Sequence, residues 1–244
     1  MSRVAIVAAL EREVRSLIRQ WLVNEKEIAG RRFRFFENEN VVLICGGIGA
    51  EASRRAAEAI IAAYAPIQLY SVGFAGALDA SLRVGEVLQP RRVINAGDGS
   101  SVHLDHGEGV LVSFGSVASA VQKANLRESF AAQAVDMEAA AVARAADARG
   151  VEFAAVKVIS DEFDFSFPAM ERFIDSNGKF LQMRFAGFVA IRPWLWPQVA
   201  HLARNSKRAS LALCERLKNI IAVSGSSVNS TKEREAFGKT GPRL

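Results

Sequence analysis

The chain has 244 residues, of which 50% are hydrophobic and 23% are charged, so it is neither a peptide-sized module nor a wholly disordered protein. No stretch approaches eighteen consecutive apolar residues and no cleavable apolar leader follows the first residues, so we expect a cytoplasmic protein without a membrane-spanning helix. The net charge of +5 is the one unusual total, and it admits nucleic acid, an anionic membrane surface or a phosphorylated substrate as a partner.

Two cysteines, Cys45 and Cys214, stand far apart in apolar surroundings. They form no closely spaced pair, so we expect buried small side chains and neither a disulfide framework nor a zinc site. We expect no bound metal and no cofactor.

The first half of the chain alternates β-branched apolar runs with segments of helical periodicity. The predicted strands are residues 3–8, 32–37, 41–45 and 67–73, and the predicted helices are residues 11–22 and 49–64. A turn at residues 38–40 joins two of these strands in a hairpin, and Pro66 ends the second helix. Strands that alternate with helices predict an α/β sheet with helices on both faces.

In the second half, predicted strands at residues 110–113 and 153–159 flank a helix at residues 137–149. Pro168 begins an aromatic-rich region, and a long helix then passes through residues 211–217. Residues 224–244 are polar and basic. We therefore expect one domain at residues 1–223 and a flexible or peripheral tail at residues 224–244.

Glu11 and Glu13 lie in the turn after the first predicted strand. This turn is at the C-terminal edge of the sheet, where open α/β folds bind their ligands. The alternative is structural, because acidic residues are favoured in the first turn of any helix.

Two glycine clusters follow predicted buried strands. They are Gly46-Gly47-Ile48-Gly49 and Gly73-Phe74-Ala75-Gly76. Glycines between a strand and a helix let backbone N–H groups approach an anion, although the spacing fits neither the dinucleotide fingerprint nor the Walker loop. We predict that both loops face one crevice, and a tight strand-to-helix turn explains the first cluster equally well.

Acidic residues mark the start of a predicted helix and the end of a predicted strand. Asp136 would cap the helix at residues 137–149, and Glu138 in its first turn is compatible with the helix dipole. The alanines that follow predict close packing, and a buried carboxylate there needs a partner. Ser160 and Asp161 end the apolar run FAAVKVI, so Asp161 would point into the crevice as a general acid; capping of the next segment is the alternative.

In this order, five segments resemble the nucleoside phosphorylase and nucleosidase superfamily, particularly its methylthioadenosine/S-adenosylhomocysteine nucleosidase branch. They are VAALEREV, GGIGAEAS, SVGFAGALDASLRVGEV, AVDMEAAAVA and VKVISDEFD. Within the superfamily, a closer similarity is to the hopanoid-associated phosphorylases. It rests on a shortened region at residues 91–133, on FPAMERFIDSNGKF and on RPWLWP.

The resemblance implies a three-layer α/β/α domain around a central mixed sheet, the nucleoside phosphorylase/hydrolase fold, assembled as a homo-oligomer. Glu138 matches the acid that binds the ribose hydroxyls, and Met137 matches the methionine beside the sugar. Asp161, after Ser160, matches the acid that protonates or hydrogen-bonds the purine at N7. Glu13 matches the base that activates the attacking water in nucleosidases. Residues 46–49 and Gly73 match loops that line the sugar and nucleophile pocket.

The chemistry of N-glycosidic cleavage supports two of these roles independently. The reaction passes through an oxocarbenium-like state, so it needs an acid at the departing base and electron-rich groups around the sugar. Asp161 and Glu138 would supply them.

Three positions depart from the family pattern or leave a role open. Phe74 stands where the matching loop commonly carries a serine that contacts phosphate or water. Glu13 is a hydrolase-like feature, because its charge would repel phosphate. The region that normally supplies the aromatic residue stacked on the purine is shortened, which leaves Val117 and Phe114 as its candidates.

We therefore expect an enzyme that cleaves an adenine nucleoside with a large apolar 5′ substituent, such as an adenosylated hopanoid lipid. The aromatic and basic residues 163–208 would face the lipid, and ordinary core packing is their alternative role. Methylthioadenosine and S-adenosylhomocysteine are alternative substrates, and water and inorganic phosphate are alternative acceptors. A noncatalytic nucleoside- or lipid-binding protein is the alternative of another class.

The positive charge fits a membrane surface better than nucleic acid. Residues 224–244 hold four basic and two acidic residues, so this tail supplies about two of the five excess charges. The other basic residues are spread along the chain, which disfavours a nucleic-acid binder. We expect peripheral association with the inner face of the membrane.

Overall fold

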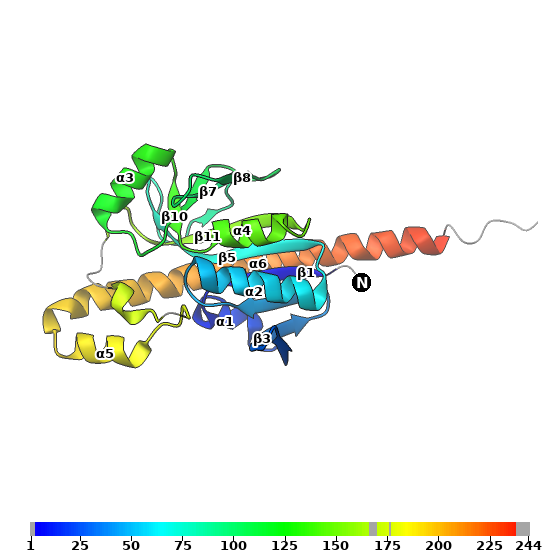
Figure 1. Ribbon diagram of the computed structural model, residues 1–244, viewed down its shortest axis with the longest axis horizontal. Helices are drawn as coiled ribbons and strands as arrows, with labels where there is room; N and C mark the ends of the chain where they lie inside the picture. Colours follow the sequence, from blue (N-terminus) through cyan, green and yellow to red (C-terminus); the bar gives the residue numbers. More distant parts are fainter. Residues whose placement is uncertain (1–2, 166–169, 176, 238–244) are drawn as a thin grey trace, which may run out of the picture.

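The computed structural model describes residues 3–165, 170–175 and 177–237 (Figure 1). Pro168 and residues 238–244 of the predicted tail lie outside the described residues. The helices are α1 (Glu11–Ile18), α2 (Ala50–Tyr64), α3 (Ala120–Phe130), α4 (Ala139–Asp147), α5 (Gln182–Ala190) and α6 (Trp196–Phe237), with short 3-10 helices η1 (Met170–Phe173) and η2 (Pro193–Leu195). The strands are β1 (Val4–Ala8), β2 (Leu22–Ile28), β3 (Arg31–Asn38), β4 (Val41–Cys45), β5 (Gln68–Ala77), β6 (Val87–Leu88), β7 (Arg92–Asn95), β8 (Ser101–His103), β9 (Val110–Ser113), β10 (Ala134–Asp136) and β11 (Glu152–Asp161).

A mixed sheet forms the centre of the fold. β1 pairs in parallel with β4 and with β5, and β5 pairs in parallel with β11. The end of β5 pairs in antiparallel orientation with β10, from which the sheet continues through β9 and β7 to β8. The expected mixed sheet is therefore confirmed, and β5 is the strand that joins its two halves.

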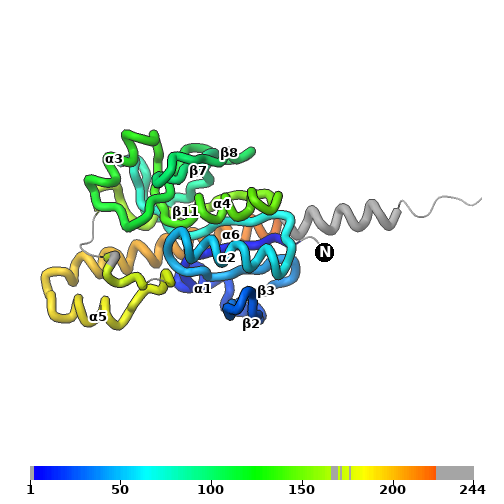
Figure 2. The backbone as a smooth tube through the Cα atoms, in the orientation of Figure 1, coloured from blue at the N-terminus to red at the C-terminus, as the bar shows by residue number. Residues whose placement is uncertain are grey.

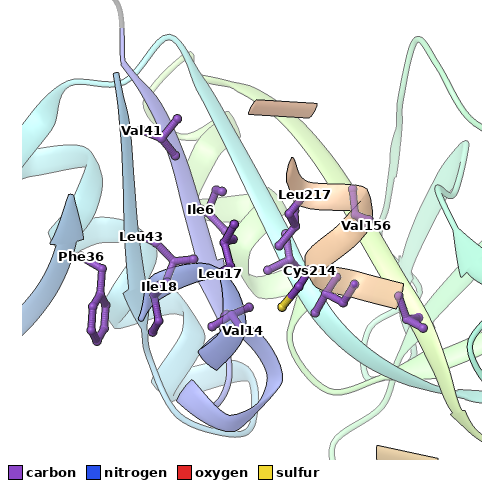
Figure 3. Close-up of a cluster of buried hydrophobic side chains, with 14 of the residues drawn as sticks. Ile6, Val14, Leu17, Ile18, Phe36, Val41, Leu43, Val156, Cys214 and Leu217 are labelled. Atoms are coloured by element: carbon purple, nitrogen blue, oxygen red, sulfur yellow. The ribbon is translucent and has the colours of Figure 1, made fainter. Parts of the chain in front are cut away.

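Helices cover both faces of the sheet (Figures 1 and 2). On one face, Ala56 and Ile60 of α2 and Val142 of α4 share a buried cluster with side chains of β1, β4 and β5. On the other face, Leu17 of α1 and Leu217 of α6 share a second cluster with further side chains of the same strands (Figure 3). The expected three-layer α/β/α arrangement is confirmed.

Several predicted boundaries are wrong because long-range strand pairing overrides local pattern. The helix predicted at residues 11–22 ends at Ile18, since residues from Leu22 onward pair with β3 as the edge strand β2. The strand predicted at residues 67–73 continues to Ala77, because β10 and β11 supply pairing partners for its second half. Residues 73–76, predicted as a glycine loop, are therefore part of β5.

The helix α6 is longer than predicted. It continues past residue 223, the predicted end of the domain, into the predicted tail and ends at Phe237. Among the residues that the structure describes, no helix combines the length and the apolar composition needed to cross a membrane.

The buried face of α6 gives a test of the fold. Leu217 is fully buried and Leu211 is 57% exposed on the same helix. We predict that Leu217→Ala lowers the free energy of unfolding by about 2–5 kcal/mol, because it leaves a cavity in the core. The matched Leu211→Ala should cost less than about 0.5 kcal/mol. Urea unfolding followed by circular dichroism measures both, and equal losses would contradict the packing of α6 on the sheet.

Candidate active site

A cavity of about 540 Å³ lies at the carboxyl ends of β1, β5 and β11. Acidic side chains from three elements reach it: Glu13 from α1, Glu138 from the residue before α4, and Asp161 from the end of β11. The predicted residues Ile48, Phe74, Met137 and Ser160 also line it. Acids that lie far apart in the sequence thus meet in one cavity.

Glu13 is buried, and its Oε2 is a buried oxygen without a hydrogen-bond partner among the described residues. Burial and the nearby charge of Glu138 raise the pKa of Glu13 to about 7, although Lys157 and Arg12 oppose the rise. Gly73 of β5 makes room for this carboxyl group, because a Cβ there would lie 2.9 Å from Oε2. A carboxyl group with this pKa and a free oxygen can accept a proton near neutral pH.

Glu138 is held by backbone groups. The N–H of Gly49 donates to its Oε1 at 2.9 Å, and the N–H of Met137 donates to its Oε2 at 3.2 Å. Desolvation and the charge of Asp136 raise the pKa of Glu138, and Lys157 opposes them. Glu138 is the residue before the first helical turn of α4, which begins two residues later than predicted.

The glycine cluster at residues 46–49 supports the site from behind. Gly46, Gly47 and Gly49 do not line the cavity, whereas Ile48 does. A Cβ at Gly46 would lie 2.5 Å from Cβ of Ala56, and Gly49 has a φ of +96° while it donates to Glu138. Both predicted glycine clusters reach one cavity, the first through Ile48 and the second through Phe74, Ala75 and Gly76. The prediction that residues 73–76 form a loop is wrong, because they are part of β5. Residues 46–49 bring α2 close to the sheet and orient Glu138.

Lys157 is a polar partner that the sequence analysis missed. It lies in the middle of β11, fully buried, with Nζ 2.8 Å from Oδ2 of Asp136. Burial lowers the pKa of Lys157, but the charges of Asp136, Glu138 and Glu13 outweigh that effect and raise it. Its signal in the sequence was the single charged residue in an otherwise apolar strand, since a buried charge needs a partner.

Asp136 serves the same cluster and is more than a helix cap. Its Oδ2 accepts from the N–H of Ala139 at 2.8 Å, and its Oδ1 accepts from the hydroxyl of Ser113 at 2.5 Å. Because Lys157 also contacts Oδ2, both oxygens of this buried carboxylate are satisfied.

Asp161 accepts hydrogen bonds on both carboxylate oxygens. The hydroxyl of Ser160 donates to Oδ1 at 2.7 Å, and Nζ of Lys123 donates to Oδ2 at 2.5 Å. Lys123 is a buried residue of α3 that the sequence analysis also missed, and it donates further to the carbonyl oxygens of Glu162 and Phe165. Lys123 therefore fixes both the carboxylate of Asp161 and the chain that follows it.

The rest of the cavity is largely apolar and is formed by the region that we expected to face a lipid. Its walls there come from η1, α5, α6 and the chain between them: Met170, Ile174, Phe180, Phe185, Val199 and Leu202. Of the two candidates for purine stacking, Val117 lines the cavity, whereas Phe114 packs against a core cluster around Ile94 and Val112. Within the described ranges, His, Cys, Asp and Glu side chains form no group of three that could hold a metal ion.

Comparisons with known sequences identify relatives of the chain. The sequence matches the family model described as the phosphorylase superfamily over residues 3–118 and 102–190. A 5′-methylthioadenosine/S-adenosylhomocysteine nucleosidase of Marinomonas sp. (strain MWYL1) is 31% identical over 99 residues, which cover 39% of this chain and 42% of that protein. The protein of the same name from Staphylococcus aureus (strain JH9) is 26% identical over 208 residues, which cover 68% of this chain and 91% of that protein.

Solved structures share the fold. The 5′-methylthioadenosine/S-adenosyl homocysteine nucleosidase of Helicobacter pylori has a TM-score of 0.68 at 18% identity, covering 91% of this chain and 98% of that chain. The futalosine hydrolase of Helicobacter pylori strain 26695 has a TM-score of 0.58 at 21% identity, covering 66% of this chain and 88% of that chain. The resemblance to the nucleoside phosphorylase and nucleosidase superfamily is thereby confirmed, and the closer similarity to the hopanoid-associated phosphorylases stays a prediction.

The raised pKa of Glu13 predicts a pH-dependent cost to stability. Folding raises this pKa from 4.5 to about 7, so the stabilisation from the neutral carboxyl group is present below pH 4.5 and is lost as the pH rises to about 7. We predict that Glu13→Gln is more stable than the wild type at pH 8 and that this difference in stability is smaller at pH 5. Thermal unfolding at the two pH values measures the gain. Glu11→Gln is the matched control, because Glu11 lies on the surface beside Arg34; a gain of equal size at both pH values for Glu13→Gln would contradict the prediction.

Proposed function

Because this chain belongs to the phosphorylase superfamily, we propose that it cleaves the N-glycosidic bond of a purine nucleoside and releases the free base. The observation that carries the proposal is the meeting of Glu13, Glu138 and Asp161 in one cavity. The unpaired Oε2 of Glu13 favours an enzyme over a noncatalytic binding protein. A buried carboxyl oxygen without a partner lowers the stability of the protein. A protein that only binds a neutral sugar would have no reason to retain such an oxygen.

Asp161 is proposed to act on the departing base. As the bond from C1′ to N9 of the purine breaks, its electron pair moves into the base, and N7 takes up a proton from Asp161, whose Oδ2 receives that proton in turn from the ammonium group of Lys123. Ser160 and Lys123 hold the two oxygens of Asp161 in place. The contribution of such a positioned acid is typically about 10²–10⁴-fold.

Glu138 is proposed to bind the ribose hydroxyls, and its negative charge would favour the oxocarbenium-like sugar. The two backbone N–H groups that hold its oxygens fix its orientation before substrate binds. Met137, Ile48 and Phe74 line the same cavity and are proposed to pack against the sugar.

Glu13 is proposed to activate water as the acceptor. Its free Oε2 would accept the proton of the water whose oxygen attacks C1′, and its pKa of about 7 suits a base near neutral pH. Inorganic phosphate is the less favoured acceptor. Phe74 offers it no hydroxyl group, and the ammonium group of Lys157 is already paired with Asp136.

We propose that the substrate is an adenine nucleoside with a large apolar 5′ substituent, such as an adenosylated hopanoid lipid. The support is the apolar extension of the cavity toward α5 and α6. The second candidate is a methylthioadenosine/S-adenosylhomocysteine nucleosidase, which the names of the curated relatives favour. For a lipid-linked substrate, we propose a cytoplasmic, homo-oligomeric enzyme that associates peripherally with the membrane.

Adenine release from adenosylhopane, methylthioadenosine and S-adenosylhomocysteine tests the proposal. We expect release from all three with the highest kcat/KM for adenosylhopane, and unchanged turnover when phosphate is omitted. Folded protein that releases no base from any of them would overturn the nucleosidase proposal, and loss of turnover without phosphate would make the protein a phosphorylase.

A variant of the same assay tests the apolar extension. Ala203 of α6 lines the cavity and Ala200 of the same helix does not. Ala203→Phe should lower kcat/KM for adenosylhopane and leave methylthioadenosine unaffected, whereas the matched Ala200→Phe should change neither. Equal effects on both substrates would place the 5′ substituent elsewhere.

The role of Asp161 predicts a dependence on the leaving group. Asp161→Asn removes the proton donor and little volume, so turnover of adenine nucleosides should fall by about 10²–10⁴-fold with a nearly unchanged KM. Turnover of 4-nitrophenyl riboside, whose leaving group needs no proton, should fall much less. Glu13→Gln should slow both substrates alike, and a similar loss on both for Asp161→Asn would count against its role as an acid.

A further inference from the structure

We infer that the surface formed by α1, α5 and the first turns of α6 docks on an anionic lipid bilayer. We call this surface the docking face. Its cations are Arg15, Arg19, Lys179, Arg184 and Lys207, and its exposed apolar side chains are Met183, Ile191 and Trp194. The inference deepens the proposed peripheral association, on which it rests, by assigning the surface and the class of lipid.

Two contiguous grooves gather the cations. The groove between α1 and α5, of about 550 Å³, is lined by Arg12, Arg15, Lys179 and Arg184. Its one acid is Glu11, which is paired with Arg34 at 2.9 Å. The groove between α1 and α6, of about 690 Å³, is lined by Arg12, Arg15, Arg19 and Lys207 and by no acid.

The cations of the docking face are available to a partner. Within the part of the chain that the structure describes, none of the five forms an ion pair with a carboxylate. Arg15 of α1 and Arg19, the residue after α1, are one helical turn apart and exposed, whereas Leu17 and Ile18 between them are buried. The face therefore presents a concentrated positive charge that the rest of the molecule does not neutralise.

The apolar part of the docking face lies on α5 and η2. Met183 is 85% exposed, Ile191 71% and Trp194 69%. Phe185 and Phe188 on the other side of α5 pack on Phe173, with ring centroids 5.3 and 5.2 Å away. Aromatic and aliphatic side chains beside arginines are typical of helices that lie in the interface of a membrane.

Hydrogen bonds fix the corner between α5 and α6, which carries Ile191 and Trp194. The indole N–H of Trp196 donates to the carbonyl oxygen of Val189 at 3.1 Å, and Nη1 of Arg192 donates to that of Phe188 at 2.9 Å. α5 and the start of α6 lie at one end of the molecule, away from β2 and β3 (Figures 1 and 2). A bilayer could therefore reach this corner without contacting the hairpin.

Charge and apolar exposure together select the bilayer among three partners. A nucleic acid would match the cations but not the exposed Met183 and Ile191. A second copy that used the same face symmetrically would bring like charges together, which is unfavourable. An anionic bilayer matches both, because its headgroups attract lysine and arginine while its interface accepts apolar and indole side chains.

Vesicle co-sedimentation without substrate tests the inference. We expect the wild type to bind vesicles that contain phosphatidylglycerol, to bind phosphatidylcholine vesicles weakly, and to lose binding at high salt. The variant Arg15→Gln/Arg19→Gln/Lys207→Gln should lower the partition coefficient about a hundredfold, at about fivefold per cation. The matched control Arg31→Gln/Arg91→Gln/Arg149→Gln removes three exposed cations from other surfaces and should keep most of the binding. Equal binding by the two variants would overturn the inference.

Two further readouts separate this surface from other roles. Trp194→Ala should weaken vesicle binding without changing the oligomeric state, whereas Ile67→Ala, which removes a side chain 55% exposed between α2 and β5, should change neither. A Trp194→Ala variant that dissociates an oligomer and still binds vesicles would make this face an interface between copies, which overturns the proposal. Adenine release from soluble methylthioadenosine is measured in parallel: vesicle binding without any release would sink the proposed function and leave the docking face intact.

Discussion

The buried ammonium group of Lys157 holds together three carboxyl groups at the candidate site. Nζ of Lys157 lies 2.8 Å from Oδ2 of Asp136, and Glu138 and Glu13 are close enough for their charges to raise the pKa of Lys157 further. Without this cation, three carboxyl groups would share an interior that solvates none of them, which costs several kcal/mol per uncompensated charge. Glu13, Glu138 and Asp136 can therefore lie together because β11 carries a lysine in its buried middle.

Glycines of β5 leave space within the sheet for the side chains of this polar cluster. In the register of β5 and β11, Lys157 is opposite Gly73 and Asp161 is opposite Gly76. A Cβ at Gly73 would lie 2.9 Å from Oε2 of Glu13, and one at Gly76 would lie 2.8 Å from Oδ2 of Asp161. Each glycine thus leaves the space that a carboxyl group occupies, and the strand interior that usually holds apolar side chains becomes the wall of a site.

Strand runs and helical periodicity predicted an α/β sheet with helices on both faces, because these are local signals. The family resemblance implied the three layers, the mixed sheet and the set of acids. The sequence could have predicted Lys157 too, since a lone charge in FAAVKVI has to be paired. Lys123 carried no such signal: its segment AVQKANLRESF is polar like any surface helix, and its burial depends on Asp161, 38 residues later. The glycines at residues 73–76 were misassigned for a similar reason, because β10 and β11, which keep them in a strand, come much later in the chain.

The cationic grooves adjoin the cavity that holds the acids, and Arg12 lines the cavity and both grooves. Phe185 of α5 lines the cavity, whereas Met183 and Arg184 of the same helix lie on the docking face. The cavity is acidic around Glu13 and Glu138 and apolar toward α5, and the five cations of the docking face do not line it. If the docking face binds an anionic bilayer as we infer, a substrate anchored in that bilayer would have to cross only the width of a helix, about 10 Å, to reach the apolar end of the cavity.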